Sequence, residues 1–287
     1  MKPLFFIISL FPKILYVCLV DLYIYIRIYK VFSFYKVTKV NLEIAYPELS
    51  KSEIELISKL SIRESLISGF ETLYTWGTST HQSNNQLFKI ENNFLLSKTY
   101  EEKNGLIIVS IHNRSVDMLL RWINSKIKTV SLYKKIKINA LEKFVKKNRE
   151  YGGSKSYETS IGGVRKILQA LKSKDAICFA ADQVPQKGLG KYIKLYNRDA
   201  YTTTLVQSLA VKTGAPVLYI FINSNKDGFL YVSVKQCGNN IYDDSKHQLL
   251  LNKDIEKIIN VRPIDYSWEY KRFKRHRPPD IDPYRSI

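Results

Sequence analysis

The sequence predicts an α/β fold, in which a single mixed sheet is covered by helices and follows an N-terminal membrane-anchoring helix. Short apolar, β-branched runs alternate with stretches of helical spacing, and this alternation predicts the sheet and its helices. The chain has 287 residues, 45% of them hydrophobic, which suffices for one sizeable core and excludes a disordered or fibrous protein. The almost charge-free N-terminus predicts the anchor.

Residues 3–26 carry only two charges, Lys13 and Asp21. No small-residue cleavage site follows this stretch, so we do not expect a removable signal peptide. A spanning helix needs about 20 consecutive, mainly apolar residues, whereas the longest charge-free runs are residues 3–12, 14–20 and 22–26. The pattern favours an interfacial or shallowly inserted anchor over residues 1–36. The alternative is a buried core helix followed by an amphipathic helix.

The domain predicted over residues 37–287 begins with a clear helix signal. Ser50 and Glu53 have the spacing of a capping box, in which the two side chains satisfy the first backbone N–H groups. Apolar residues continue at roughly helical spacing to a predicted end near Gly77. The polar residues 78–85 then predict a loop.

The rest of the chain alternates between strand and helix signals. Apolar runs predict strands near residues 106–111, 127–132, 176–181, 216–222 and 229–234. Helical spacing predicts helices near residues 116–125, 139–150, 161–173 and 201–213. Because strands and helices take turns, we expect one sheet covered by helices.

The chain is strongly basic, with 45 Lys and Arg against 26 Asp and Glu, a net charge of +19. This charge predicts an anionic partner, such as lipid head groups, nucleic acid or an acidic carrier protein. The excess is concentrated in residues 121–150, which contain ten basic and two acidic side chains. Three widely spaced cysteines without a CxxC pair predict neither a disulfide framework nor a thiolate metal site.

A histidine and an aspartate flank the turn that follows the strand predicted near residues 106–111. His112 lies at the end of the strand, and Asp117 lies just inside the next helix. A carboxylate that folds back across such a turn can hold Nδ1–H and leave Nε2 free to accept a proton from a hydroxyl. His112 is thus a candidate general base oriented by Asp117. The alternative is structural, with Ser115 as the helix N-cap and Asp117 as a favourable acid in the first turn.

Asp182 and Gln183 directly follow the apolar run over residues 176–181. Open α/β sheets place functional side chains beyond the carboxyl ends of their strands, so this pair is a second candidate for the site. The alternative is a turn aspartate.

An ordered set of segments resembles a known family. Residues 112–117 (HNRSVD) are similar to the H-x4-D/E motif of glycerolipid and lipid A acyltransferases. Further similar segments are 41–49 (NLEIAYPEL), 149–153 (REYGG), 162–165 (GGVR), 181–183 (ADQ), 213–217 (TGAPV) and 262–268 (RPIDYSW). Over nearly its whole length the chain resembles the bacterial lipid A biosynthesis lauroyl/myristoyl acyltransferases of the lysophospholipid acyltransferase superfamily. It departs from them at residues 187–196, and it has Asp117 where many members have Glu.

The resemblance implies a membrane-associated O-acyltransferase of lipopolysaccharide biosynthesis. Such an enzyme moves a fatty acyl chain from acyl carrier protein to a hydroxyl of a phosphorylated lipid A precursor, a secondary acylation at the cytoplasmic face of the bacterial inner membrane. It implies His112 as general base with Asp117, and neither a metal nor another cofactor. Contacts to the substrate, its phosphates or the oxyanion are expected from Arg149, Asp182, Gln183, Arg165 and Arg114. For Arg149 the alternative is a solvated cation at a helix end.

Two alternative functions remain open. A glycerolipid or other lysolipid acyltransferase would use the same chemistry on another acceptor. A non-enzymatic, basic RNA- or membrane-binding protein would use residues 268–277, in which aromatic and basic side chains are interleaved. The ordered set of segments favours the lipid A acceptor, so nucleic acid is not an expected partner.

Overall fold

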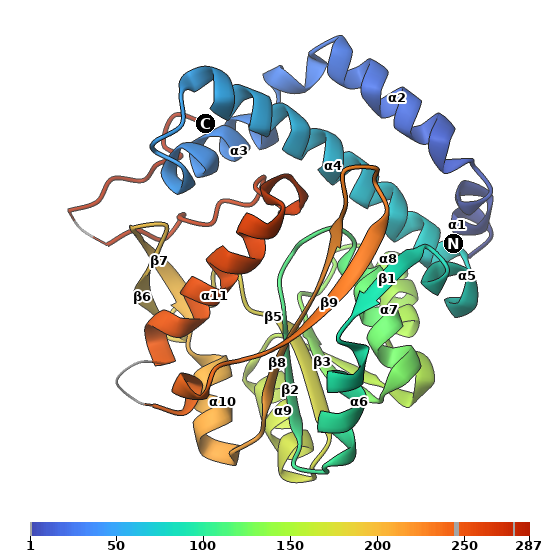
Figure 1. The fold of residues 1–287 in the computed structure, drawn as a ribbon, viewed down its shortest axis with the longest axis vertical. Helices are drawn as coiled ribbons and strands as arrows, with labels where there is room; N and C mark the ends of the chain where they lie inside the picture. The colour runs from blue at the N-terminus through green and yellow to red at the C-terminus, as the bar shows by residue number, and fades with distance from the viewer. Residues whose placement is uncertain (1, 244–246, 278) are drawn as a thin grey trace.

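A seven-stranded mixed sheet lies at the centre of the structure (Figure 1). The computed structural model describes residues 2–243, 247–277 and 279–287. The strand order is β1-β9-β8-β2-β5-β3-β4; the pair β8 and β9 is antiparallel, and the other neighbouring pairs are parallel. The strands are β1 (Leu87–Glu91), β2 (Leu106–Ser110), β3 (Thr129–Tyr133), β4 (Lys155–Glu158), β5 (Ala176–Ala180), β8 (Val217–Ser224) and β9 (Leu230–Gln236).

Helices cover both faces of the sheet because successive side chains of a strand point to opposite faces. On β2, Ile107 and Val109 belong to one buried cluster, whereas Leu106 and Ile108 belong to the other. The helices that contribute to the first cluster are α3 (Ser33–Ala45), the start of α4 (Lys51–Gly77), α9 (Ile161–Lys172), α10 (Leu205–Thr213) and α11 (His247–Val261). Those of the second are α6 (Asn93–Glu101) and α7 (Val116–Lys126). The predicted α/β fold with a mixed sheet between helices is confirmed.

The long helix that descends from the upper left towards the right in Figure 1 is α4 (Lys51–Gly77). The predicted capping box is confirmed, because the Ser50 side chain accepts from the Glu53 N–H and the Glu53 side chain accepts from the Ser50 N–H. The segment expected to be a loop after Gly77 contains a short helix, α5 (Thr80–Asn84). A further helix, α8 (Asn139–Arg149), agrees with the expected range.

A second, two-stranded sheet corrects the prediction of a single sheet. It is the antiparallel hairpin of β6 (Gly190–Leu195) and β7 (Arg198–Thr203), so α10 begins after residue 203 instead of near residue 201. The hairpin turn is made by Tyr196 and Asn197, both at positive φ. Such turns usually carry glycine, and its absence here removed the sequence signal.

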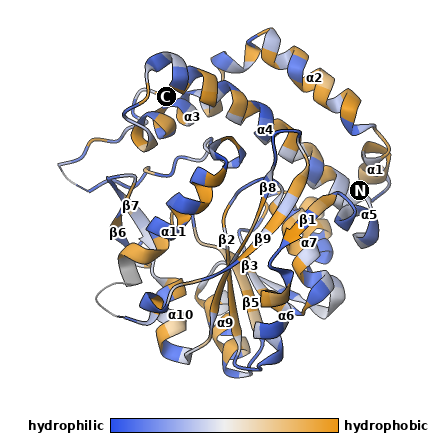
Figure 2. Cartoon of the chain, viewed as in Figure 1, coloured by the Kyte–Doolittle hydropathy of each residue, from blue (hydrophilic) through white to orange (hydrophobic). Residues whose placement is uncertain are grey.

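The N-terminal segment forms two short helices where one was predicted. α1 (Lys2–Ser9) and α2 (Lys13–Tyr25) meet at 85°. No described helix is by itself long and apolar enough to cross a membrane, and these two satisfy that criterion only as a bent pair. Large apolar side chains of α1, α2 and the bend between them are exposed, including Ile7, Leu10 and Ile14, each at least 65%. Figure 2 shows both helices as largely hydrophobic. This exposure contradicts the alternative of a buried core helix.

The inner side of this helix pair packs on α4. The ring of Phe5 in α1 contacts Trp76 of α4 and Phe144 of α8. Gly77 permits this approach, since a Cβ there would lie 2.1 Å from the Phe5 carbonyl oxygen. Buried residues of α2 join a small apolar cluster with α4. The predicted boundary between residues 36 and 37 falls inside α3.

Candidate active site

His112 and Asp182 lie side by side at the carboxyl edge of the sheet. β2 and β5 are adjacent parallel strands whose last residues, Ser110 and Ala180, are paired in register. His112 and Asp182 each follow their strand by two positions, so the register brings them together although 70 residues separate them in the sequence. This is the edge at which open α/β sheets place functional side chains.

The Asp182 carboxylate contacts His112 at two atoms. Its Oδ1 lies 2.8 Å from Nδ1 of the ring, and its Oδ2 accepts a hydrogen bond from the His112 backbone N–H at 3.2 Å. The Asp182 side chain is 2% exposed and the His112 side chain 31% exposed. The carboxylate is therefore buried behind the ring, while the ring itself stays accessible.

The other ring nitrogen faces Gln183. The Gln183 amide nitrogen lies 3.2 Å from Nε2 of His112. An amide NH2 group only donates hydrogen bonds, so in this orientation Nε2 accepts and the ring proton is on Nδ1, directed at Asp182. A neutral ring in this tautomer can take a proton from a hydroxyl that approaches Nε2.

The two groups shift each other's pKa. Desolvation lowers the pKa of His112, but the charge and hydrogen bond of Asp182 outweigh it, so this pKa lies above its ordinary value of 6.5. Desolvation raises the pKa of Asp182, but the charge and hydrogen bonds of His112 outweigh it, so this pKa lies below 3.8. The pair thus favours a protonated ring beside an ionised carboxylate, the state that a general base reaches once it has taken a proton.

Asp117 binds Arg149 and not the His112 ring. Nε of Arg149 lies 2.7 Å from Oδ1 of Asp117, and Nη2 lies 3.0 Å from Oδ2, a bidentate ion pair between the first turn of α7 and the last turn of α8. The prediction that Asp117 holds Nδ1 was wrong, because Asp182 occupies that atom. Ser115 does cap α7, since its side chain accepts from a backbone N–H of the first turn.

Arg149 is close enough to act on the site electrostatically. Its charge lowers the pKa of His112, although less than Asp182 raises it. The Arg149 side chain is 19% exposed, and its guanidinium lies 5.6 Å from the centre of the Tyr133 ring. The Arg149 guanidinium is therefore a mostly buried cation fixed by Asp117, near His112. The alternative of a solvated charge at a helix end does not fit.

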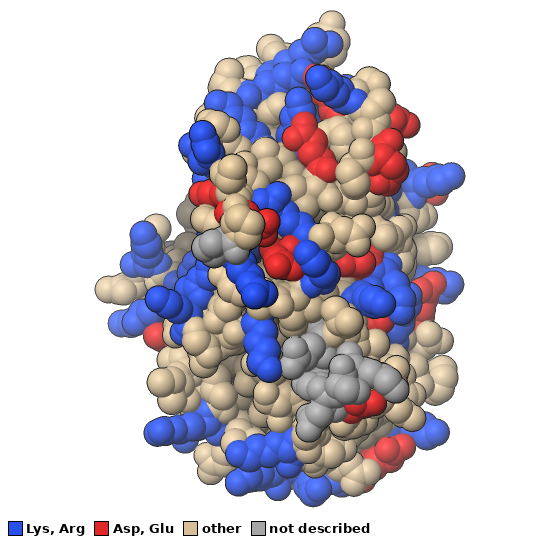
Figure 3. All heavy atoms as spheres, turned by 90° about the vertical axis from the view of Figure 1, so that its left-hand side faces the viewer, with Lys and Arg blue, Asp and Glu red and all other residues tan. Residues whose placement is uncertain are grey.

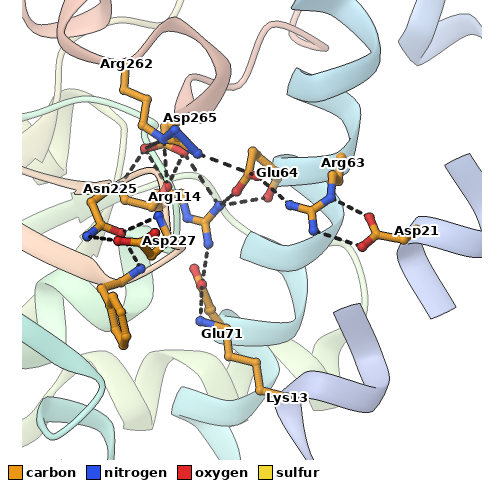
Figure 4. A network of polar contacts seen from close by, with 12 residues as sticks. Lys13, Asp21, Arg63, Glu64, Glu71, Arg114, Asn225, Asp227, Arg262 and Asp265 are labelled. Carbon is orange, nitrogen blue, oxygen red and sulfur yellow. Dashed lines mark hydrogen bonds and ion pairs between the residues drawn. The ribbon is translucent and has the colours of Figure 1, made fainter. Parts of the chain in front are cut away.

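Arg114 holds the His112 loop from inside the protein (Figure 4). Its side chain is 1% exposed, and its guanidinium forms ion pairs with Glu64 and Glu71 of α4 and lies 3.6 Å from Asp265. The backbone of Arg114 has a φ of 50°, in the left-handed region that non-glycine residues seldom adopt. Protein carboxylates enclose the Arg114 guanidinium in this structure, and its predicted substrate contact stays a prediction.

The ion pairs around Arg114 extend to the N-terminal helices (Figure 4). Lys13 of α2 lies 3.2 Å from Oε1 of Glu71, the carboxylate oxygen that also binds Arg114. Asp21 of α2 binds Arg63 at 2.5 and 3.1 Å, and Arg63 contacts Glu64. Ion pairs thus connect α2 to Arg114, which lies in the loop that carries His112.

The C-terminal segment completes the site and contributes a residue that the sequence analysis missed. Ser267 donates its backbone N–H to the His112 carbonyl oxygen at 3.0 Å. Two residues later, Glu269 accepts from the Ser65 hydroxyl at 3.1 and 3.2 Å. Desolvation raises the pKa of Glu269, and its charge adds to the rise in the pKa of His112. The sequence signals near it were the family similarity of residues 262–268 and the interleaved aromatic and basic side chains of residues 268–277, and neither indicated a role for Glu269.

Arg165 is exposed in the first turns of α9, and no contact among the described residues connects it to His112.

The basic surface is broad. Figure 3 shows Lys and Arg spread over the face that carries the β6–β7 hairpin and α11. Within residues 121–150, Arg121 is buried against backbone carbonyls of α4 and the turn after it. The exposed lysines of this stretch are Lys126, Lys128, Lys134, Lys135, Lys137, Lys143 and Lys147.

The chain is similar in sequence to several known proteins. The chain is 25% identical over 243 residues to the lipid A biosynthesis palmitoleoyltransferase of Escherichia coli K12, which covers 83% of this chain and 78% of that protein. It is 21% identical over 262 residues to the lipid A biosynthesis lauroyltransferase of the same organism, covering 86% and 80% of the two chains. A lipid A biosynthesis acyltransferase of Haemophilus influenzae is 21% identical over 248 residues, covering 85% and 78%.

The profile of one protein family, the bacterial lipid A biosynthesis acyltransferases, matches residues 4–275 of the chain. These residues include most of α1, all of α2, the loop that carries His112 and the C-terminal segment that lies against this loop. The chain therefore belongs to the bacterial lipid A biosynthesis acyltransferase family.

Proposed function

We propose that this acyltransferase moves a fatty acyl chain from acyl carrier protein to a hydroxyl of a lipid A precursor, at the cytoplasmic face of the bacterial inner membrane. The observation that supports the proposal most directly is the partly exposed His112 ring, held at Nδ1 by buried Asp182 and contacted at Nε2 by the Gln183 amide. In this arrangement a general base can act on a hydroxyl.

In the proposed reaction, Nε2 of His112 removes the proton of the acceptor hydroxyl. The oxygen attacks the thioester carbonyl carbon, and the C–S bond breaks when the tetrahedral intermediate collapses. The thiolate of the carrier protein leaves with the proton that the imidazolium returns, so the ring ends neutral. Asp182 stabilises the imidazolium form of the ring, and this stabilisation is what raises the pKa of His112.

Arg149 is the proposed cation for the oxyanion or for a phosphate of the glycolipid. Asp117 is proposed to act through Arg149, by fixing the guanidinium with its two oxygens. Gln183 is proposed to contact the substrate, since the acceptor hydroxyl must take its place at Nε2. Arg165 stays a more distant candidate for contact with the acceptor phosphates.

The surface supports the two proposed macromolecular contacts. The exposed apolar side chains of α1 and α2 are proposed to enter the membrane interface, with nearby cations at the head groups. The exposed lysines of α8 and of residues 134–137 are proposed to meet the acidic acyl carrier protein.

The test replaces His112 with alanine and measures acyl transfer from acyl carrier protein to a purified lipid A precursor. We expect activity to be lost while the protein still folds and sediments with membranes. His81→Ala is the matched control, because His81 is an exposed histidine on α5. Transfer that survives in His112→Ala would remove the assignment.

The acceptor is tested separately. Lysophosphatidic acid offered in place of the lipid A precursor distinguishes the lysolipid alternative, and mass spectrometry of lipid A from cells with and without the protein identifies the acyl chain. Salt-sensitive RNA binding unaffected by His112→Ala, together with no acyl transfer, would support the non-enzymatic alternative.

A further inference from the structure

A cavity of about 220 Å³ lies beneath the bend between α1 and α2. Leu10, Phe11 and Pro12 of the bend form one side, and Phe70 of α4 and Met118 of α7 form part of the other. This volume is below the 300–1,000 Å³ usual for a pocket that encloses a whole small ligand. The cavity therefore suits a head group or a part of a larger molecule.

An ion pair supplies the charges of this cavity, whose lining also includes the polar residues Ser9, Tyr74 and Gln86. Glu71 and Lys13 both line it, and they lie 3.2 Å apart. The Glu71 side chain is 3% exposed; Oε1 is shared by Lys13 and Arg114, whereas Oε2 has no hydrogen-bond partner among the described residues. A buried carboxylate oxygen without a partner is unfavourable, so the cavity is suited to a group that donates a hydrogen bond.

Lys13 provides the opposite charge at the mouth of the cavity. Its side chain is 36% exposed, so the ammonium group can meet an anion without leaving Glu71. The ligand that fits is a zwitterion, with an N–H donor for Glu71 and an anionic group for Lys13.

The surroundings of the cavity indicate a lipid. Leu10 is 65% exposed and Phe11 is 40% exposed at the rim, and Ile14 follows at 67%. An apolar rim around a charged pair fits a molecule whose hydrocarbon part stays outside in the membrane while its head group enters.

We propose that this cavity binds the head group of a phospholipid that carries a primary ammonium next to its phosphate, as phosphatidylethanolamine does. The ammonium donates to Oε2 of Glu71, and the phosphate contacts Lys13. This lipid is a second ligand, distinct from the acyl acceptor. The proposal rests on membrane association of the N-terminal helices but not on acyl transfer.

The test measures lipid retention by native mass spectrometry of the full chain in detergent micelles, without acyl donor or acceptor. Dioleoyl lipids with phosphoethanolamine, N,N-dimethylphosphoethanolamine, phosphocholine and phosphoglycerol head groups are added at equal concentration. The dimethyl head group keeps one N–H and the choline head group has none, although the two are similar in size. We expect the phosphocholine lipid to be retained about tenfold more weakly than the dimethyl lipid, because it cannot make the one charge-assisted hydrogen bond.

Two variants locate the binding. Lys13→Met removes the phosphate partner, and Ser9→Trp fills the cavity from its rim; each should reduce retention of the ethanolamine lipid at least to the level of the choline lipid. Lys2→Met is the matched control, since Lys2 is exposed on α1 and does not line the cavity. Equal retention of the dimethyl and choline lipids, or equal loss in Lys2→Met and Lys13→Met, would overturn the proposal. The retention measurement needs no acyl transfer. Lipid binding can therefore be disproved while the proposed acyl transfer stands, and acyl transfer can be disproved while lipid binding stands.

Discussion

Asp182→Asn is the substitution that tests the active site most sharply. The change keeps the size of a side chain that is almost completely buried, and it removes the charge that faces Nδ1 of His112. An asparagine can turn its NH2 group towards Nδ1, which would then have to accept, and the ring proton would move to Nε2. A ring in that tautomer cannot take a proton from the acceptor hydroxyl. We expect kcat to fall by about 10²- to 10⁴-fold.

The pH dependence separates this role from a structural one. In the wild type, the acid limb of kcat/KM should follow the raised pKa of His112, so it lies above pH 6.5. Without the Asp182 charge, desolvation remains the main influence on the ring, and the limb should move below that value.

Asp117→Asn is the matched control. It lowers activity through Arg149, but we expect it to leave the acid limb close to its wild-type position, because Asp117 does not contact the ring. Initial rates of both variants across pH, with acyl carrier protein as donor, give the comparison. If Asp117→Asn moves the limb and Asp182→Asn does not, the assignment of the carboxylate is refuted.

The same pair predicts how stability changes with pH. The raised pKa of His112 contributes stability that is fully present below its unfolded value of 6.5 and is lost as pH rises through the folded pKa. The lowered pKa of Asp182 contributes stability that is present above its unfolded value of 3.8 and is lost as pH falls through the folded pKa. Asp182→Asn should therefore destabilise the protein most between pH 3.8 and 6.5, as measured by urea unfolding.

Four further substitutions have expected outcomes, one of them a control. Arg149→Lys replaces a bidentate contact to Asp117 with a single ammonium, and we expect kcat to fall about 10- to 100-fold with the protein still folded, measured in the same transfer assay. Gly163→Ala places a Cβ 2.0 Å from a carbonyl oxygen of β4 and should cost about 1–3 kcal/mol in urea unfolding, whereas Gly162→Ala, with its nearest contact at 3.7 Å, should be nearly neutral. Ser50→Ala removes the α4 capping box and should lower the unfolding free energy by about 1 kcal/mol, read from thermal melts.

Much of the fold could be predicted because the signals are local. The capping box at Ser50, the apolar run of β2 and the amphipathic helices follow from residues close together in the chain. The edge strands β1 and β4 were not predicted, because they are partly exposed and lack a continuous apolar run. The bend between α1 and α2 was also missed, although Pro12 stands at it.

The sequence predicted several residues of the candidate site, but it did not predict which of them contact one another. His112, Asp182 and Gln183 were all expected near strand ends, and the structure brings these three together. His112 and Asp182 each lie two positions after the end of their strand. Their contact could have been inferred from this, but only if β2 and β5 were known to be neighbours. Glu269 comes from a segment more than 150 positions after His112, and nothing local connects the two.

By itself the sequence determined which chemistry the chain carries: an imidazole and two candidate carboxylates just beyond apolar runs, on a basic chain with an apolar beginning. Only the tertiary structure decided which carboxylate serves the imidazole. β2 and β5 become neighbours when the sheet assembles, and their register sets Asp182 against Nδ1. The start of α7 directs Asp117 to Arg149, at the end of α8. Hydrogen bonds act over about 3 Å, so the choice depends on how distant segments are placed, which no local pattern records.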